Sequence, residues 1–136
     1  MKVVVTGLAV TLAACAAMGG RLMNASDALE ERTARLYDEV RRDPLDRVSA
    51  EQTAQDLARA AFDFRRAVER ESPRADLEAA FDRIAQPYHA LREHYGERAA
   101  DPVVRDCFQD VSEAYLDVEG ALQYRLTQFN SGNKVR

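Results

Sequence analysis

The sequence of 136 residues has no tryptophan, two histidines, two cysteines, and only six glycines and four prolines. Glycine and proline are the residues that destabilise helices most, so their scarcity beside abundant alanine favours helix over strand. No segment shows the alternation of apolar and polar residues that marks a half-buried strand. Apolar residues make up 46% and charged residues 31%, which is typical of a globular chain. The composition therefore indicates one small helical domain.

Lysine is also scarce, because 17 of the 19 basic residues are arginines and only Lys2 and Lys134 are lysines. With 23 acidic residues the formal net charge is −4, and it becomes 18 − 23 = −5 if Lys2 leaves with a signal peptide. Arginine can indicate recognition of phosphate or carboxylate, although codon usage in a GC-rich genome explains the bias more simply. A mildly acidic chain has no general attraction for nucleic acid, so no nucleic-acid partner is expected.

Motifs for cofactor and catalytic chemistry are missing as well. A di-iron bundle needs Glu three residues before a metal-binding histidine, but Gln86 and Leu91 stand there before His89 and His94. The Cys-x-x-Cys-His motif of covalent haem and the Gly-rich phosphate loop are also absent. Cys107 lies at the edge of an apolar stripe and is interpreted as a small core residue rather than a nucleophile. We therefore expect no metal, no cofactor and no enzymatic activity.

The first fourteen residues have the pattern of a secretory signal. Lys2 gives a basic start, and an apolar segment of about twelve residues extends from Val3 to Ala14. As a helix it would be about 18 Å long, which is too short for a bilayer core of about 30 Å. The segment fits the apolar region of a signal peptide instead.

The signal ends in Leu12-Ala13-Ala14-Cys15, which resembles the lipobox of bacterial lipoproteins. The resemblance implies cleavage before Cys15, a diacylglycerol on its thiol and acylation of its amine, and such acyl chains make a durable membrane anchor. Ala16 stands where an Asp would retain the protein at the inner membrane, so the resemblance implies the outer membrane, with the domain facing the periplasm. The alternative is ordinary cleavage after Ala16, which would release a soluble periplasmic protein.

These assignments divide the chain into four parts: a signal peptide at 1–14, a lipidated tether at 15–24, a helical bundle domain at 25–130 and a frayed tail at 131–136. If Cys15 is lipidated, Cys107 has no partner within the chain and no disulfide can staple the fold. Cys107 is then either buried and inert or able to link two copies.

Apolar residues recur with a period near 3.6 in four successive stretches, which predicts four helices. The first stripe contains Leu22, Leu29, Leu36 and Val40; the second Ala50, Ala54, Leu57, Ala61, Phe64 and Val68; the third Leu77, Phe81, Ile84, Tyr88, Leu91 and Tyr95; the fourth Val104, Phe108, Val111, Tyr115, Val118, Leu122, Leu126 and Phe129.

Capping residues suggest where these helices begin and end. Asn24 or Ser26 can cap the first helix, and Asp43-Pro44 stops it. Ser49 with Gln52 forms a capping box for the second. Ser72-Pro73 and Asp101-Pro102 each place a capping side chain before proline, at the starts of the third and fourth.

Short loops between such helices predict an all-α fold, an antiparallel four-helix up-and-down bundle. Pro87 lies within the third helix, where it removes a backbone hydrogen bond and clashes with the preceding turn. It should either kink that helix or split it, and because the stripe continues past Pro87 we expect a bend.

Apolar side chains on polar faces provide the first candidate site. Phe62 lies about 140° from the stripe of its helix, with three arginines around it, Arg59, Arg65 and Arg66. Leu116 and Tyr124 also point away from the core stripe. Aromatic residues beside arginine are typical of protein-protein hot spots. The simpler interpretation is a scattered apolar residue covered by arginine stems.

A second candidate site is a ring of tyrosines on the core stripes: Tyr88, Tyr95 and Tyr115. Their hydroxyls need partners or water, and they could line a small ligand pocket near Pro87. Two functions therefore remain open. One is a non-enzymatic envelope lipoprotein that binds another protein, and the other is a carrier of a small ligand.

Overall fold

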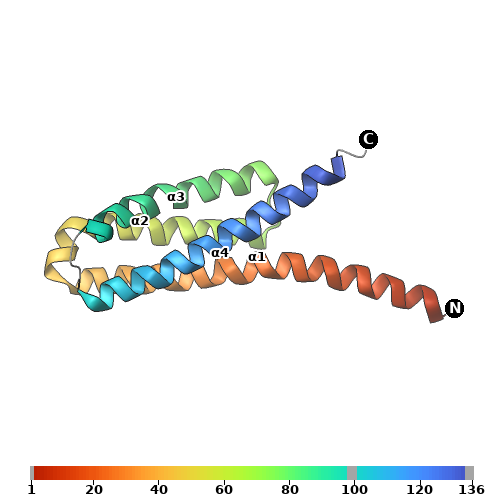
Figure 1. Ribbon diagram of the computed structural model, residues 1–136, viewed down its shortest axis with the longest axis horizontal. Coiled ribbons are helices and arrows are strands. Elements are labelled where there is room, and N and C mark those ends of the chain that lie inside the picture. The colour runs from red at the N-terminus through yellow and green to blue at the C-terminus, as the bar shows by residue number, and fades with distance from the viewer. Residues whose placement is uncertain (1, 98–100, 134–136) are drawn as a thin grey trace.

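The computed structural model describes the backbone of residues 2–97 and 101–133 and the side chains of residues 20–95 and 101–123. The chain forms four helices, α1 (Lys2–Arg42), α2 (Pro44–Glu69), α3 (Arg74–Glu97) and α4 (Pro102–Asn133) (Figure 1). No strand occurs in these ranges, which confirms the all-α prediction. Among the described residues, no helix has a stretch that is both long and apolar enough to cross a membrane.

Two Asp-Pro pairs start helices in the same way. The Asp43 carboxylate accepts a hydrogen bond from the backbone N–H of Leu45 at 2.9 Å, and Asp101 accepts one from Val103 at 2.8 Å. Each carboxylate satisfies an N–H that has no partner within the helix, and the proline that follows lacks an N–H to satisfy. The start predicted at Asp101-Pro102 is confirmed, whereas Asp43-Pro44 both ends α1 and begins α2.

The predicted starts of the first two helices are wrong. Helix α1 passes through residues 24–26 without a break, and Ser26 is fully buried, donating to the Met23 carbonyl at 2.8 Å. Ser49 lies inside α2 and donates to the Leu45 carbonyl at 3.2 Å, while Gln52 donates to Asp56. A serine hydroxyl can bond a carbonyl one turn back as well as cap a helix, so its presence alone does not mark a start.

Helix α2 ends in a Schellman motif that the sequence analysis did not find. The Ser72 N–H reaches the Ala67 carbonyl and the Glu71 N–H reaches that of Val68, both at 3.0 Å. This arrangement places Glu71 in the left-handed region, with φ of 54°. Helix α3 then continues across Pro87 without splitting, and the predicted bend stays a prediction.

The helices pack in pairs, α1 against both α2 and α4, and α2 against α3. Between α1 and α2, Arg41 pairs with Glu51 near their turn, and Glu30 pairs with Arg65 further along. Figure 1 shows that the first part of α1 and the last part of α4 extend beyond the ends of α2 and α3. Helices α3 and α4 contact each other mainly through aromatic side chains.

One continuous core runs between the helices and is built from all four stripes. Its fully buried members include Leu29 and Leu36 from α1, Phe64 from α2, Ile84 from α3 and Val111 from α4. Burying one such side chain stabilises a fold by about 1.5–3 kcal/mol. The predicted stripes are therefore confirmed as the core-facing sides wherever their side chains are described.

Candidate functional site

Aromatic rings join α3 to α4. Phe81, Tyr88 and Tyr95 recur every seven residues on α3, and Phe108 and Tyr115 do so on α4, a spacing that keeps each set on one side of its helix. The rings of Tyr88 and Tyr115 stack with centroids 3.9 Å apart, and those of Phe81 and Tyr115 with centroids 5.2 Å apart. The Tyr95 and Phe108 centroids lie 5.3 Å apart. Because these large rings fill the space between α3 and α4, the two backbones approach each other closely at few points.

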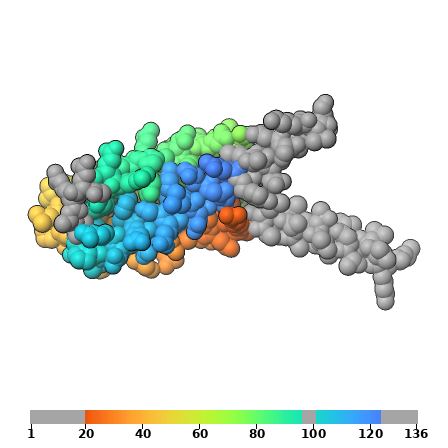
Figure 2. All heavy atoms as spheres, in the orientation of Figure 1, coloured from red at the N-terminus to blue at the C-terminus, as the bar shows by residue number. Residues whose placement is uncertain are grey.

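The separation of these two helices leaves a surface hollow of about 440 Å³. We call it the α3–α4 hollow and define it by six lining residues: Tyr88, Arg92, Tyr95, Arg105, Phe108 and Leu116. Gln109 and Ser112 complete its wall. Figure 2 shows this side of the molecule, with α3 in green above α4 in blue. Leu116 is 59% exposed, so the hollow presents apolar surface to solvent beside the rims of buried rings.

The charge of the α3–α4 hollow differs in sign from that of the whole chain. Its lining contains two arginines and no acidic residue, although the chain has a net charge of −4. Within the part of the chain that the structure describes, Arg92 forms no hydrogen bond or ion pair. Its guanidinium is therefore available to a carboxylate from outside.

The α3–α4 hollow brings together residues from both predicted sites. Tyr88 and Tyr95 line it, and so does Leu116. Tyr115 lies behind them, buried against the Tyr88 ring, and burial raises the pKa of its hydroxyl to about 12. Since the two rings are in contact, no ligand-sized space separates them.

Phe62 belongs to a different surface on α2. Its side chain is 41% exposed, and the Arg66 guanidinium lies over the ring at 5.5 Å from the centroid, a cation–π contact. Arg59 is also exposed. These residues are not among those that line the α3–α4 hollow, so the structure does not join them to Leu116.

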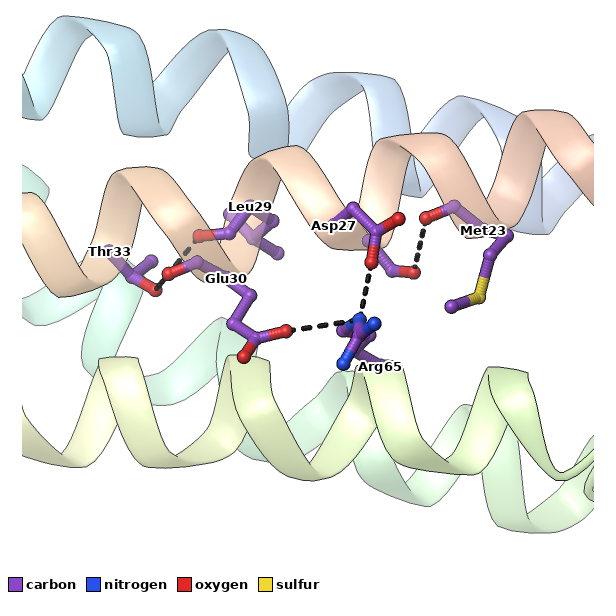
Figure 3. A network of polar contacts seen from close by, with 7 residues as sticks. Met23, Asp27, Leu29, Glu30, Thr33 and Arg65 are labelled. Atoms are coloured by element: carbon purple, nitrogen blue, oxygen red, sulfur yellow. Dashed lines mark hydrogen bonds and ion pairs between the residues drawn. The ribbon is translucent and has the colours of Figure 1, made fainter.

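Arg65, three residues after Phe62 in the sequence, has a structural role. Its guanidinium pairs with Asp27 and, at 3.2 Å, with Glu30, both on α1 (Figure 3). On the same helix, the hydroxyl of buried Thr33 donates to the carbonyls of Leu29 and Glu30 at 2.8 and 3.0 Å. These contacts stay within α1 and between α1 and α2, so Arg65 holds the two helices together.

Two predicted site residues lie outside the described side chains. Cys15 falls before residue 20 and Tyr124 falls after residue 123. Lipidation of Cys15 and a role for Tyr124 in partner binding therefore stay predictions.

A buried acidic group at one end of the molecule was missed. Asp46 is 8% exposed, and its Oδ1 lies 3.7 Å from His94 Nε2, an ion-pair distance too long for a hydrogen bond. Neither Asp46 Oδ2 nor the Tyr95 hydroxyl has a hydrogen-bond partner among the described residues. Burial raises the pKa of Asp46, as does nearby Asp43, while His94 lowers it. Asp46 stands one turn before Ala50, so extending the second stripe backward could have found it.

Arg92 and Arg105 were not singled out from the sequence either. Arg92 follows Tyr88 by four residues and Arg105 precedes Phe108 by three, so each lies one turn from a stripe residue. That spacing was the available signal, but it applies to many exposed arginines in this chain. Among the described residues, no group of three or more metal-ligating side chains is assembled.

A larger hollow of about 620 Å³ lies between α1 and α4. Its lining consists of small and polar residues, among them Gly20, Asn24 and Asp117. No exposed large apolar side chain contributes to it, so it lacks the apolar anchor that Leu116 gives to the α3–α4 hollow.

No protein-family model, curated protein or solved structure matches this chain. The evidence for function therefore comes from the side chains themselves, and the α3–α4 hollow has the strongest combination of exposed apolar surface, aromatic rings and available charge.

Proposed function

We propose that this chain is a non-enzymatic envelope lipoprotein whose helical bundle binds another protein through the α3–α4 hollow. In this proposal the acylated Cys15 holds the domain at the outer membrane, facing the periplasm. Tethering raises the effective concentration of the domain near that membrane, so a modest interface suffices for binding.

The proposed architecture is an antiparallel four-helix up-and-down bundle. Contacts between neighbouring helices support it, because residue numbers rise along one helix as they fall along its partner. Arg41 pairs with Glu51 whereas Glu30 pairs with Arg65. Likewise Tyr95 contacts Phe108 whereas Phe81 contacts Tyr115. Helices connected by short turns pack in this way.

The observation that carries the binding proposal is the exposure of Leu116 beside aromatic rings and arginines. Tyrosine and arginine around an apolar anchor are the residues enriched in protein-protein hot spots. An exposed leucine alone is ordinary. Here it adjoins a hollow of about 440 Å³ that a partner side chain can enter, which an isolated surface leucine lacks.

The second candidate function is a small-ligand carrier. It is favoured by one observation, that Tyr88 and Tyr95 both line the α3–α4 hollow, whose volume suits a small molecule. The hollow lies at the surface, however, and Tyr115 is packed behind Tyr88. A partner protein can cover such an open surface more completely than a small ligand can.

Native mass spectrometry of the full chain, extracted in mild detergent from the bacterial envelope, tests these proposals. Leu116→Asp is compared with a matched control, Val103→Asp. Both positions are exposed aliphatic residues on α4, at 59% and 53%, but only Leu116 lines the α3–α4 hollow. Phe62→Asp examines the other candidate surface.

We expect a chain starting at acylated Cys15 with a second protein attached in the wild type and in Val103→Asp, and without it in Leu116→Asp. A partner that is lost only in Phe62→Asp would move the interface to α2. A small adduct in place of a protein would favour the carrier. An unlipidated chain starting near Ala17 would contradict the lipoprotein proposal.

A further inference from the structure

The α3–α4 hollow is elongated along its two helices. On α4 its lining residues Arg105, Phe108, Ser112 and Leu116 recur every three or four residues, a stretch of about 16 Å at 1.5 Å per residue. On α3, Tyr88, Arg92 and Tyr95 repeat the same spacing along the opposite wall. A trough with helical walls of this length matches about three turns of a third helix.

The basic and the apolar residues that line the hollow lie toward opposite ends of it. Arg92 and Arg105 stand with Tyr95 toward the start of α4, while Leu116 lies eleven residues beyond Arg105. No acidic residue lines the hollow beside these arginines. Glu113, for example, is directed to Arg32 of α1 at 3.9 Å.

Arg105 already has a partner within the chain, whereas Arg92 has none among the described residues. An occupant without negative charge would therefore desolvate the Arg92 guanidinium without replacing its water. Removing a charge from water without a partner is costly, whereas a carboxylate from the occupant would pair with Arg92 and recover the loss. An apolar side of the occupant would at the same time cover Leu116 and the ring edges. Charge and apolarity thus specify the chemistry of the occupant together.

We propose that the α3–α4 hollow receives an amphipathic helix of another protein, with carboxylates at one end of its apolar side. The carboxylates lie at Arg92, at the basic end of the hollow, and the apolar residues lie against Tyr88, Phe108 and Leu116. This inference rests on the proposed function, that the chain binds a protein here, and adds the chemical class of the partner.

The test uses a displayed library of helical peptides about three turns long, roughly 11 residues, with randomised outward positions. The library is selected in parallel on the full wild-type chain and on Arg92→Glu. The affinity of the enriched peptides is then measured by fluorescence anisotropy for both chains, for Leu116→Asp and for the matched control Val103→Asp.

We expect the wild-type chain to enrich peptides with acidic residues at one end of an apolar stripe. The Arg92→Glu chain should bind these peptides about tenfold more weakly, because a repulsive pair of charges replaces an attractive one. Selection on Arg92→Glu should enrich peptides with basic residues instead. Leu116→Asp should abolish binding, and Val103→Asp should leave it unchanged. Enrichment without acidic bias, or equal binding to Leu116→Asp, would overturn the inference.

The two proposals can fail separately. If an envelope partner is lost with Leu116→Asp but kept, at unchanged affinity, with Arg92→Glu, the α3–α4 hollow is an interface and its acidic occupant is disproved. If no variant affects any partner in the envelope, the proposed function fails whatever the peptides show.

Discussion

Asp46 is the only charged side chain that is buried in the part of the chain that the structure describes. Burial disfavours the ionised form, so the pKa of Asp46 is raised from its ordinary value of 3.8. A carboxylic acid whose pKa is raised on folding binds its proton more tightly in the native state than in the unfolded one. The native state is therefore penalised at pH values above the raised pKa, and the penalty disappears as the pH falls below it.

Replacing this carboxylate should stabilise the protein at neutral pH. We expect Asp46→Asn to have a higher free energy of unfolding than wild type at pH 7, because no charge is then buried. The difference should shrink as the pH falls through the raised pKa. Urea denaturation at several pH values measures this, with exposed Asp63→Asn as the control. A variant less stable than wild type at pH 7 would show that the ion pair with His94 outweighs the cost of burial.

Cys107 is a free, buried cysteine, which answers a question that the sequence left open. Burial raises the pKa of its thiol, so little of the reactive thiolate forms at neutral pH. We expect a thiol reagent to modify native Cys107 on the order of a hundred times more slowly than the chain in urea, because reaction requires local opening. The absorbance of the released chromophore measures the rate, and Cys107→Ala is the blank. Equal rates would show that the Cys107 thiol is exposed in the native protein and can form a disulfide with a second copy.

At the scale of the element, the end of α2 contains a local conflict. The Schellman motif needs a residue in the left-handed region, and glycine adopts it most easily, yet Glu71 occupies it with φ of 54°. For a non-glycine residue this conformation costs roughly 1–2 kcal/mol. The hydrogen bonds from Glu71 and Ser72 to the last turn of α2 compensate for that cost.

Glycine at this position should relieve the strain. We expect Glu71→Gly to raise the free energy of unfolding by about 0.5–1 kcal/mol, since the relief exceeds the extra entropy that glycine gives the unfolded chain. Thermal denaturation followed by circular dichroism measures the change. Arg70→Gly is the matched control, because Arg70 has φ of −81° and gains nothing from glycine. If both variants lose stability alike, Glu71 is not strained.

Whole-molecule stability depends on one core shared by all four helices. Leu36 is fully buried in it, whereas Leu45 is 84% exposed. Leu36→Ala should lower the free energy of unfolding by about 2–5 kcal/mol, because it leaves a cavity, and Leu45→Ala should change it by no more than about 0.5 kcal/mol.

The shared core also predicts a single unfolding transition. In urea, far-ultraviolet circular dichroism and tyrosine fluorescence should change together in wild type and in Leu36→Ala. The chain has no tryptophan, and three of its five tyrosines, Tyr88, Tyr95 and Tyr115, lie at the contact between α3 and α4, so tyrosine fluorescence reports mainly on that contact. Separate transitions would show that the contact between α3 and α4 is lost before or after the rest of the protein unfolds.

Local features were recoverable from the sequence because helical periodicity and capping depend on neighbouring residues. The spacing of Leu29, Phe64 and Ile84 identified sides that the structure buries, and Asp101-Pro102 identified a helix start. The prediction of helix starts failed where one side chain can form two kinds of local hydrogen bond. The Ser49 hydroxyl, which is suited to capping, donates instead to a carbonyl inside α2.

The candidate site was decided only by tertiary structure. Arg92 and Arg105 lie on different helices, and their meeting depends on the register in which α3 packs against α4. That register is set by how Tyr88 and Tyr115 stack, and the same rings hold the two backbones apart and open the α3–α4 hollow. By itself the sequence determined which side of each helix is buried, because that pattern is local. Packing between distant rings determined where a partner can bind, because a surface hollow exists only between elements that have already been placed.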